Sequence, residues 1–84
     1  MDKVTLDLSQ ALEDAKPLAT RLPRKSSLRR SYILLYLAFR AARARKFGRC
    51  YEFVDQAIPN SRGFGISGTL IGVHNHLSHQ LQAV

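Results

Sequence analysis

Apolar and polar residues alternate at the start of the chain, and the pattern then changes to helical spacing. The alternation over residues 3–8 has a period of two and predicts a short, half-buried strand. Ser9 follows at the position of a helix N-cap, and the segment 10–22 has apolar residues at helical spacing. Pro17 lies inside this segment, and because a mid-helix proline removes a hydrogen bond, we expect the helix to be short or kinked.

The strongest helical pattern covers residues 27–47, between the capping residues Ser26 and Ser27 and the helix-ending Gly48. The middle of this segment, "YILLYLAF" (32–39), is apolar on nearly every side. A helix of this kind must be covered on several sides, either by its own domain or by a second copy of the chain. The segment 27–47 is therefore the predicted centre of the fold.

Two further patterns complete the chain. Residues 50–58 have helical spacing and end at Pro59, and a glycine-rich loop separates them from a helical segment over 69–84. The chain therefore predicts a single all-α domain over its 84 residues, with three to four short helices packed around the central helix and at most one short N-terminal strand. In this division residues 1–22 form an arm or ribbon with a short helix, and residues 49–84 form a helical pair with the glycine-rich loop.

Chain length and cysteine content bear on assembly and location. A chain of this length buries only about 60% of the surface that its unfolded state exposes, so we expect a homodimer with Tyr32, Leu35 or Phe39 at or beside its interface. Cys50 is the single cysteine, which excludes an internal disulfide, suits a reducing cytoplasm and is typical of a small buried apolar side chain. The apolar run 32–39 is far shorter than the roughly 20 residues of a membrane helix, so we expect no membrane partner.

The net charge of +7 is concentrated in one third of the chain. The segment 23–50 contains no acidic residue, and its basic residues are Arg24, Lys25, Arg29, Arg30, Arg40, Arg43, Arg45, Lys46 and Arg49. A concentrated field attracts polyanions, and arginine pairs bidentately with phosphate, which favours nucleic acid as the partner. Cations near a helix C-terminus also stabilise the helix dipole, so part of this charge has a structural explanation.

The candidate nucleic-acid contacts are the basic residues on and directly after the central helix: Arg29, Arg30, Arg40, Arg43, Arg45, Lys46 and Arg49. Three other residues are candidates for single phosphate contacts. Ser26 and Ser27 stand at the start of the central helix, where backbone N–H groups favour an anion. Arg62 stands beside glycine amides at the start of the last helical segment.

The remaining motifs do not predict an enzyme. "GFGISG" matches G-x-G-x-x-G, but no strand precedes it and no acidic residue follows Asp55, which excludes a dinucleotide site. His76 and His79 share a helical face without a third ligand at a standard spacing, so we expect no metal. No nucleophile has an evident base, and we therefore expect neither a catalytic residue nor a cofactor.

The stretch 3–42 resembles the ribbon-helix-helix family of DNA-binding proteins, with "VTLDL" as ribbon, "SQALEDAKPLATRL" as first helix and "RKSSLRRSYILLYLAFRAA" as capped second helix. The resemblance implies a dimer whose paired ribbons place Lys3, Thr5 and Asp7 in the major groove, while the second helix holds a phosphate at its N-terminus. Asp7 and Pro17 depart from the family's pattern.

The stretch 50–81 is loosely similar to a helix-turn-helix, with "CYEFVDQAI" as support helix and "GISGTLIGVHNHLSHQL" as recognition helix. The polar residues of that second helix are Ser67, Thr69, Asn75 and His76. The loop between the two helices is longer than the usual tight turn, and the second helix contains no arginine or lysine.

These observations predict a small non-catalytic protein that binds nucleic acid, with DNA favoured. The expected role is that of a dimeric regulator or accessory factor of a phage or mobile element, in the cytoplasm. The alternative is an inhibitor module that uses the same arginines to dock on an acidic host protein or a nucleoprotein complex. Sequence alone leaves both alternatives open.

Overall fold

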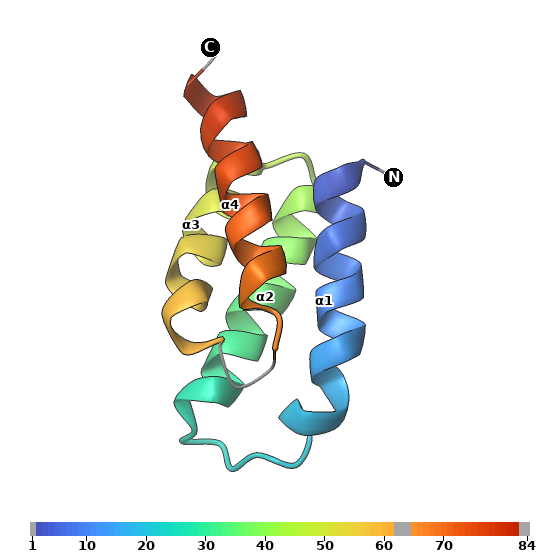
Figure 1. Ribbon diagram of the computed structural model, residues 1–84, viewed down its shortest axis with the longest axis vertical. Coiled ribbons are helices and arrows are strands. Elements are labelled where there is room, and N and C mark those ends of the chain that lie inside the picture. The colour runs from blue at the N-terminus through green and yellow to red at the C-terminus, as the bar shows by residue number, and fades with distance from the viewer. Residues whose placement is uncertain (1, 62–64, 83–84) are drawn as a thin grey trace.

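The helices of the chain run alternately up and down and form a bundle (Figure 1). Over the residues that it describes, 2–61 and 65–82, the computed structural model contains α1 (Lys3–Ala19), α2 (Ser27–Arg43), α3 (Phe47–Ala57), the 3-10 helix η1 (Ile58–Asn60) and α4 (Ser67–Gln82). Each helix packs against the next, and α4 closes the ring against α1. The bundle measures 40 × 23 × 19 Å, and the predicted all-α class is confirmed.

The N-terminal segment is helical, so the predicted N-terminal strand is wrong. Asp2 is the N-cap of α1, and its Oδ1 accepts hydrogen bonds from the backbone N of Thr5 at 2.8 Å and from the Thr5 hydroxyl at 2.9 Å. The helix buries Val4 and Leu8, which fit helical spacing as well as they fit alternation. Leu6, the remaining apolar residue of the alternation, is 53% exposed.

Two further expectations about α1 need correction. Ser9 lies in the interior of α1 and is not its N-cap, because the helix already begins at Lys3. Pro17 does not shorten the helix, which continues through it to Ala19 and spans 17 residues. Pro17 lies in the last turn of α1. Its missing N–H costs one hydrogen bond there, and few helical residues follow that could be affected.

The central helix ends before the predicted Gly48, and its last residue is Arg43. The backbone N of Lys46 donates to the carbonyl oxygen of Ala41 at 2.9 Å, and the backbone N of Arg45 donates to the carbonyl oxygen of Ala42 at 3.0 Å. These two bonds form a Schellman motif, in which the residue after the C-cap takes a left-handed conformation. Arg45 takes this conformation with φ 62°, although glycine is usual there.

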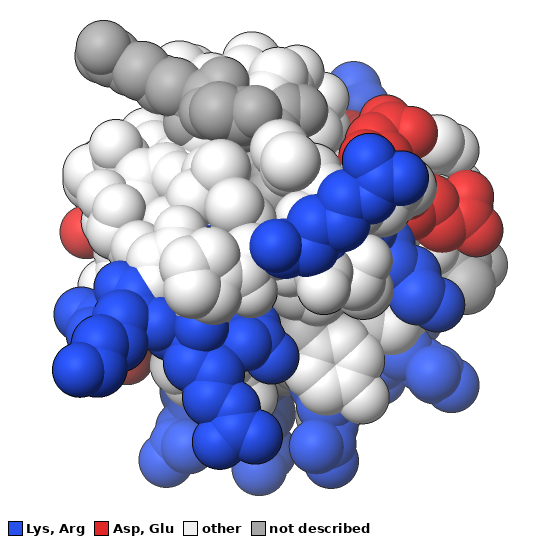
Figure 2. Space-filling view, turned by 90° about the horizontal axis from the view of Figure 1, so that it is seen from below, with Lys and Arg blue, Asp and Glu red and all other residues white. Residues whose placement is uncertain are grey.

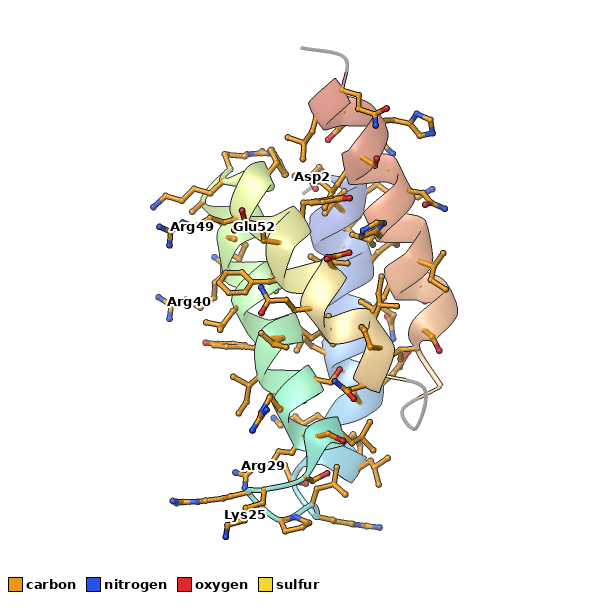
Figure 3. The ribbon with its side chains drawn as sticks, turned by 90° about the vertical axis from the view of Figure 1, so that its left-hand side faces the viewer. Asp2, Lys25, Arg29, Arg40, Arg49 and Glu52 are labelled. Atoms are coloured by element: carbon orange, nitrogen blue, oxygen red, sulfur yellow. The ribbon has the colours of Figure 1, made fainter. Side chains whose placement is uncertain are left out.

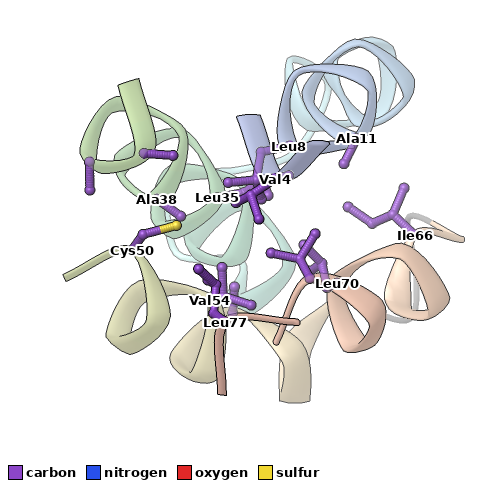
Figure 4. Packing of buried hydrophobic residues seen from close by; sticks show 14 of the residues in the cluster. Val4, Leu8, Ala11, Leu35, Ala38, Cys50, Val54, Ile66, Leu70 and Leu77 are labelled. Carbon is purple, nitrogen blue, oxygen red and sulfur yellow. The ribbon is translucent and has the colours of Figure 1, made fainter. Parts of the chain in front are cut away.

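The core lies along the axis of the bundle, between all the helices (Figure 4). Its fully buried large side chains include Leu8, Leu35, Val54, Leu70 and Leu77. Alanines line the helix contacts and let the backbones approach closely: Ala11, Ala15, Ala38, Ala42 and Ala57. The buried hydroxyl of Ser31 donates to the carbonyl oxygen of Ala57 at 2.9 Å, which fixes α2 on the end of α3.

The buried residues bear on the expectations about assembly and Cys50. Leu35 is only 1% exposed and therefore cannot lie at a dimer interface, whereas Tyr32 and Phe39 are half-buried against the core of their own chain. The homodimer itself stays a prediction. Cys50 is fully buried, and burial raises the pKa of its thiol to about 11, so it packs as a small apolar side chain.

None of the described helices is both long and apolar enough to cross a bilayer.

Candidate nucleic-acid interface

One side of α2 faces away from the rest of the bundle. The helix packs against α1 on one flank and against α3 on the other, which leaves the outer face of α2 open. This outer face consists of Arg29, Ile33, Tyr36, Arg40 and Arg43, at helical spacings of four, three, four and three. Ile33 is 51% exposed and Tyr36 is 47% exposed, so apolar and aromatic side chains lie between the cations.

A shallow groove lies beside this face, where the C-terminal half of α2 meets the N-terminal half of α3. The basic groove, as we call it, has a volume of about 280 Å³ and is lined by Leu37, Arg40, Ala41, Ala44, Lys46, Arg49 and Phe53. Figure 3 shows that Arg40 and Arg49, which belong to different helices, project from the same side of the molecule. Arg29 and Lys25 extend from that side farther down the bundle.

Most cations of this surface are not neutralised. In the described part of the chain, the one arginine or lysine that lies within 4 Å of a carboxylate is Arg45, beside Asp2, and the other carboxylate contact within this distance joins Asp55 to the His74 ring. The guanidinium of Arg43 lies 5.7 Å from the ring centre of Phe39, a cation–π contact that leaves its charge in place. Figure 2, viewed along the bundle, shows lysine and arginine side chains projecting mainly from the lower half of the view.

The structure divides the candidate contacts into groups. Arg29, Arg40 and Arg43 share the outer face of α2, and Lys46 and Arg49 join Arg40 around the basic groove. These candidates therefore share one side of the molecule, over α2 and the start of α3, with Ile33 and Tyr36 between Arg29 and the other cations.

Other candidate contacts lie apart from this surface or are already engaged. Arg45 turns to the opposite flank, where its Nη1 lies 2.6 Å from Oδ2 of Asp2. Arg30 is exposed about a quarter turn from Arg29 around α2, on the flank of Leu37 but two turns before it along the helix. Ser26 is the N-cap of α2 and accepts a hydrogen bond from the backbone N of Arg29 at 3.4 Å, whereas Ser27 is exposed in the first turn. Arg62 lies outside the described residues.

The apolar floor of the basic groove is missing from the sequence-based candidates. Leu37 and Phe53, which we call the floor of the groove, line it together with the cations, and Phe53 also packs against the core. Their spacings carried a signal, because Leu37 precedes Arg40 by three residues and Phe53 follows Arg49 by four. The signal becomes visible only once α2 and α3 are known to be neighbours.

The histidines of α4 do not form a ligand site, and one of them, His74, has a structural role. His74 Nε2 lies 3.0 Å from Oδ1 of Asp55, and the His74 ring stacks on Tyr51 with ring centres 4.5 Å apart, so His74 links α4 to α3. Over residues 2–61 and 65–82, no group of three side chains could hold a metal ion.

The three residues that the ribbon-helix-helix resemblance suggests as base contacts, Lys3, Thr5 and Asp7, lie on helix α1. Thr5 is 2% exposed on α1 and donates its hydroxyl to Asp2, so it cannot reach a nucleic-acid base. The "GFGISG" motif lies partly outside the described residues, and within it Gly65 takes a positive φ of 71° just before α4. Neither Thr5 nor Gly65 lines the basic groove.

Comparison of the chain with models of protein families, with curated proteins and with solved structures gave no match.

Proposed function

We propose that the protein binds nucleic acid without catalysis, with DNA as the favoured partner, and acts as a small regulator or accessory factor. The binding surface consists of the outer face of α2 and the basic groove. The observation that carries this proposal is the group of unneutralised cations on two neighbouring helices, with Arg29 and Arg43 on the outer face and Arg40, Lys46 and Arg49 around the groove.

The physical basis is charge complementarity with a phosphate backbone. Each phosphate that a cation neutralises releases a condensed counterion, so affinity falls with rising salt. Arginine is suited to this task because its planar guanidinium binds two phosphate oxygens at once. A titration of duplex DNA, single-stranded DNA and RNA over a series of salt concentrations tests the proposal directly.

A second candidate function has an observation of its own. Ile33 and Tyr36 expose apolar area in the middle of the outer face of α2, as the anchor residues of a protein interface do. In this alternative the cations dock on an acidic protein, as a mobile-element inhibitor would on a host enzyme. Absence of binding to any nucleic acid at about 0.15 M salt favours this second function, because phosphate contacts of this number give measurable non-specific affinity.

A further inference from the structure

The basic groove combines two chemistries within one small surface. Its lining combines the cations Arg40, Lys46 and Arg49, which we call the rim, with the floor residues, the aromatic Phe53 and the aliphatic Leu37. The volume of about 280 Å³ is at the lower limit of the roughly 300–1,000 Å³ of small-molecule pockets, and the groove is open to solvent. It therefore fits one flat group of a longer ligand better than a whole enclosed molecule.

The cations of the rim are free to bind an anion. None of the three has an ion pair within 4 Å to a described carboxylate. Glu52 follows Arg49 by one turn of α3, and Figure 3 shows both near the same edge of the molecule, yet the two side chains form no such pair. The rim thus presents a phosphate site directly beside the apolar floor.

The outer face of α2 also combines cations with apolar and aromatic side chains. From Arg29 to Arg40 the helix rises about 16 Å, and the outward residues between them are Ile33 and Tyr36. Duplex DNA is read in its major groove by hydrogen bonds to base edges, from arginine, asparagine, glutamine, serine or threonine. This stretch offers an isoleucine and a tyrosine instead, which match the flat faces of unpaired bases better than the polar edges of paired ones.

We infer that the basic groove binds single-stranded nucleic acid, with one base on the Phe53 and Leu37 floor and the adjoining phosphates on Arg40, Lys46 and Arg49. The inference rests on the proposed function and names the form of nucleic acid that this site takes. Single-strand sites of this kind combine a positive channel with aromatic stacking platforms and tolerate any base, because every base has a π-face. Tyr36 is a second platform, one turn of α2 before Arg40.

The test compares two labelled probes of equal length by fluorescence anisotropy at one salt concentration. The probes are an oligothymidine of about 12 nucleotides, within the 4–16 nucleotides of known single-strand sites, and a mixed-sequence duplex. We expect tighter binding of the single strand. Phe53→Leu keeps an apolar side chain, somewhat smaller, and removes the ring, and should weaken single-strand binding about tenfold because base–aromatic stacking is lost.

The matched control is Phe47→Leu, the same change in the first residue of α3, outside the groove. It should leave both affinities unchanged. If Phe53→Leu is unfolded by circular dichroism, the exposed pair Lys46→Gln and Arg49→Gln replaces it, and this pair must weaken the single strand more than the duplex.

Three results overturn the inference. Equal or tighter binding of the duplex overturns it and leaves the proposed function in place. Tight single-strand binding that the groove variants do not alter moves the site away from the groove. Failure to bind either probe at about 0.15 M salt overturns the proposed function as well, because phosphate contacts alone should be detectable there.

Discussion

Asp2 and Arg45 lie 43 residues apart in the chain and form an ion pair of 2.6 Å, which joins the N-cap of α1 to the turn between α2 and α3. The two carboxylate oxygens of Asp2 have different partners, since Oδ1 accepts from Thr5 and Oδ2 from Arg45. The backbone N–H of Thr5 is the main cause that holds the pKa of Asp2 below its ordinary value of 3.8, and the Thr5 hydroxyl and Arg45 act in the same direction. Partial burial opposes them.

This lowered pKa predicts a loss of stability in acid. Because the folded state binds the Asp2 proton more weakly than the unfolded chain, the stabilisation is complete well above pH 3.8 and is lost as the pH falls through the folded pKa. Asp2→Ala should lower the free energy of unfolding at pH 7 by about 1 kcal/mol, the usual effect of losing an N-cap. Urea melts at pH values from 2 to 7 should show the free energies of unfolding of the wild type and of Asp2→Ala converging in acid.

Asp2→Asn is the control for this prediction, because asparagine caps a helix about as well as aspartate but carries no charge for Arg45. It should retain most of the stability at pH 7 and show a flatter dependence on acid pH. A difference between wild type and Asp2→Ala that stays constant from pH 7 to pH 2 would contradict the assignment of the titrating group.

The backbone of Arg45 predicts a stabilising substitution. A left-handed conformation disfavours a residue with a Cβ by about 1–2 kcal/mol, and Arg45 takes it with φ 62°. The Arg45 side chain that forms the ion pair with Asp2 is 67% exposed, and such surface pairs contribute only about 0–1 kcal/mol to stability. Arg45→Gly should therefore raise the thermal midpoint by a few degrees, as about 1 kcal/mol does in a domain of this size.

Arg45→Ala separates the two effects, because it keeps the strained conformation and removes the ion pair. It should be less stable than both the wild type and Arg45→Gly. An Arg45→Gly variant that melts below the wild type would show that the ion pair outweighs the strain.

The buried thiol of Cys50 predicts a loss of stability in base. Burial raises its pKa from 9.0 to about 11, with the negative charge of Asp2 adding to the shift. The folded state thus favours the protonated thiol, so this stabilisation is present below pH 9 and is lost as the pH rises from 9 to 11. Over that interval the free energy of unfolding should fall by about 2 kcal/mol more in the wild type than in Cys50→Ala.

A thiol reagent gives an independent measurement on Cys50. Because the side chain is fully buried and protonated at pH 8, labelling should follow unfolding and rise with added urea. Rapid labelling of the native protein would place Cys50 at the surface and would contradict its packing against the core.

The errors of the sequence-based prediction have local physical causes. Val4 and Leu8 fit a strand and a helix equally well, and the choice depends on the cap at Asp2 and on the helices that cover them. The end of α2 was misplaced because the Schellman motif uses Arg45, while Gly48, the expected helix stop, lies inside α3. These two errors therefore concern the type of the N-terminal element and the position of a helix end.

The candidate site was predictable in part. The row of Arg29, Tyr36, Arg40 and Arg43 follows from helical spacing alone, because all of them lie on one helix. The basic groove is different, since it forms only where a tight turn folds α3 back on α2 and brings Phe53 into the same groove as Arg40. That contact joins two helices, and no periodicity within either helix encodes it.

The outer face of α2 carries the last prediction. Arg40→Gln combined with Arg43→Gln should weaken binding to all nucleic-acid sequences about equally, because phosphate contacts carry no sequence information. The slope of log affinity against log salt should flatten by up to about 2, close to one for each lost phosphate contact. Both side chains are exposed, so the fold should persist, with a small loss from the contact between Arg43 and Phe39.

The pair Lys16→Gln and Arg21→Gln is the matched control, since it removes the same charge from exposed positions on and just after α1. Because the effect on binding comes from contacts and only slightly from net charge, this control should leave the salt slope nearly unchanged. Equal flattening by both pairs would mean that the protein attracts nucleic acid through its overall charge of +7 and that α2 holds no phosphate. Flattening by the α2 pair alone would assign the contacts to Arg40 and Arg43, whose neighbours on the same helix already supply the apolar area that bases require.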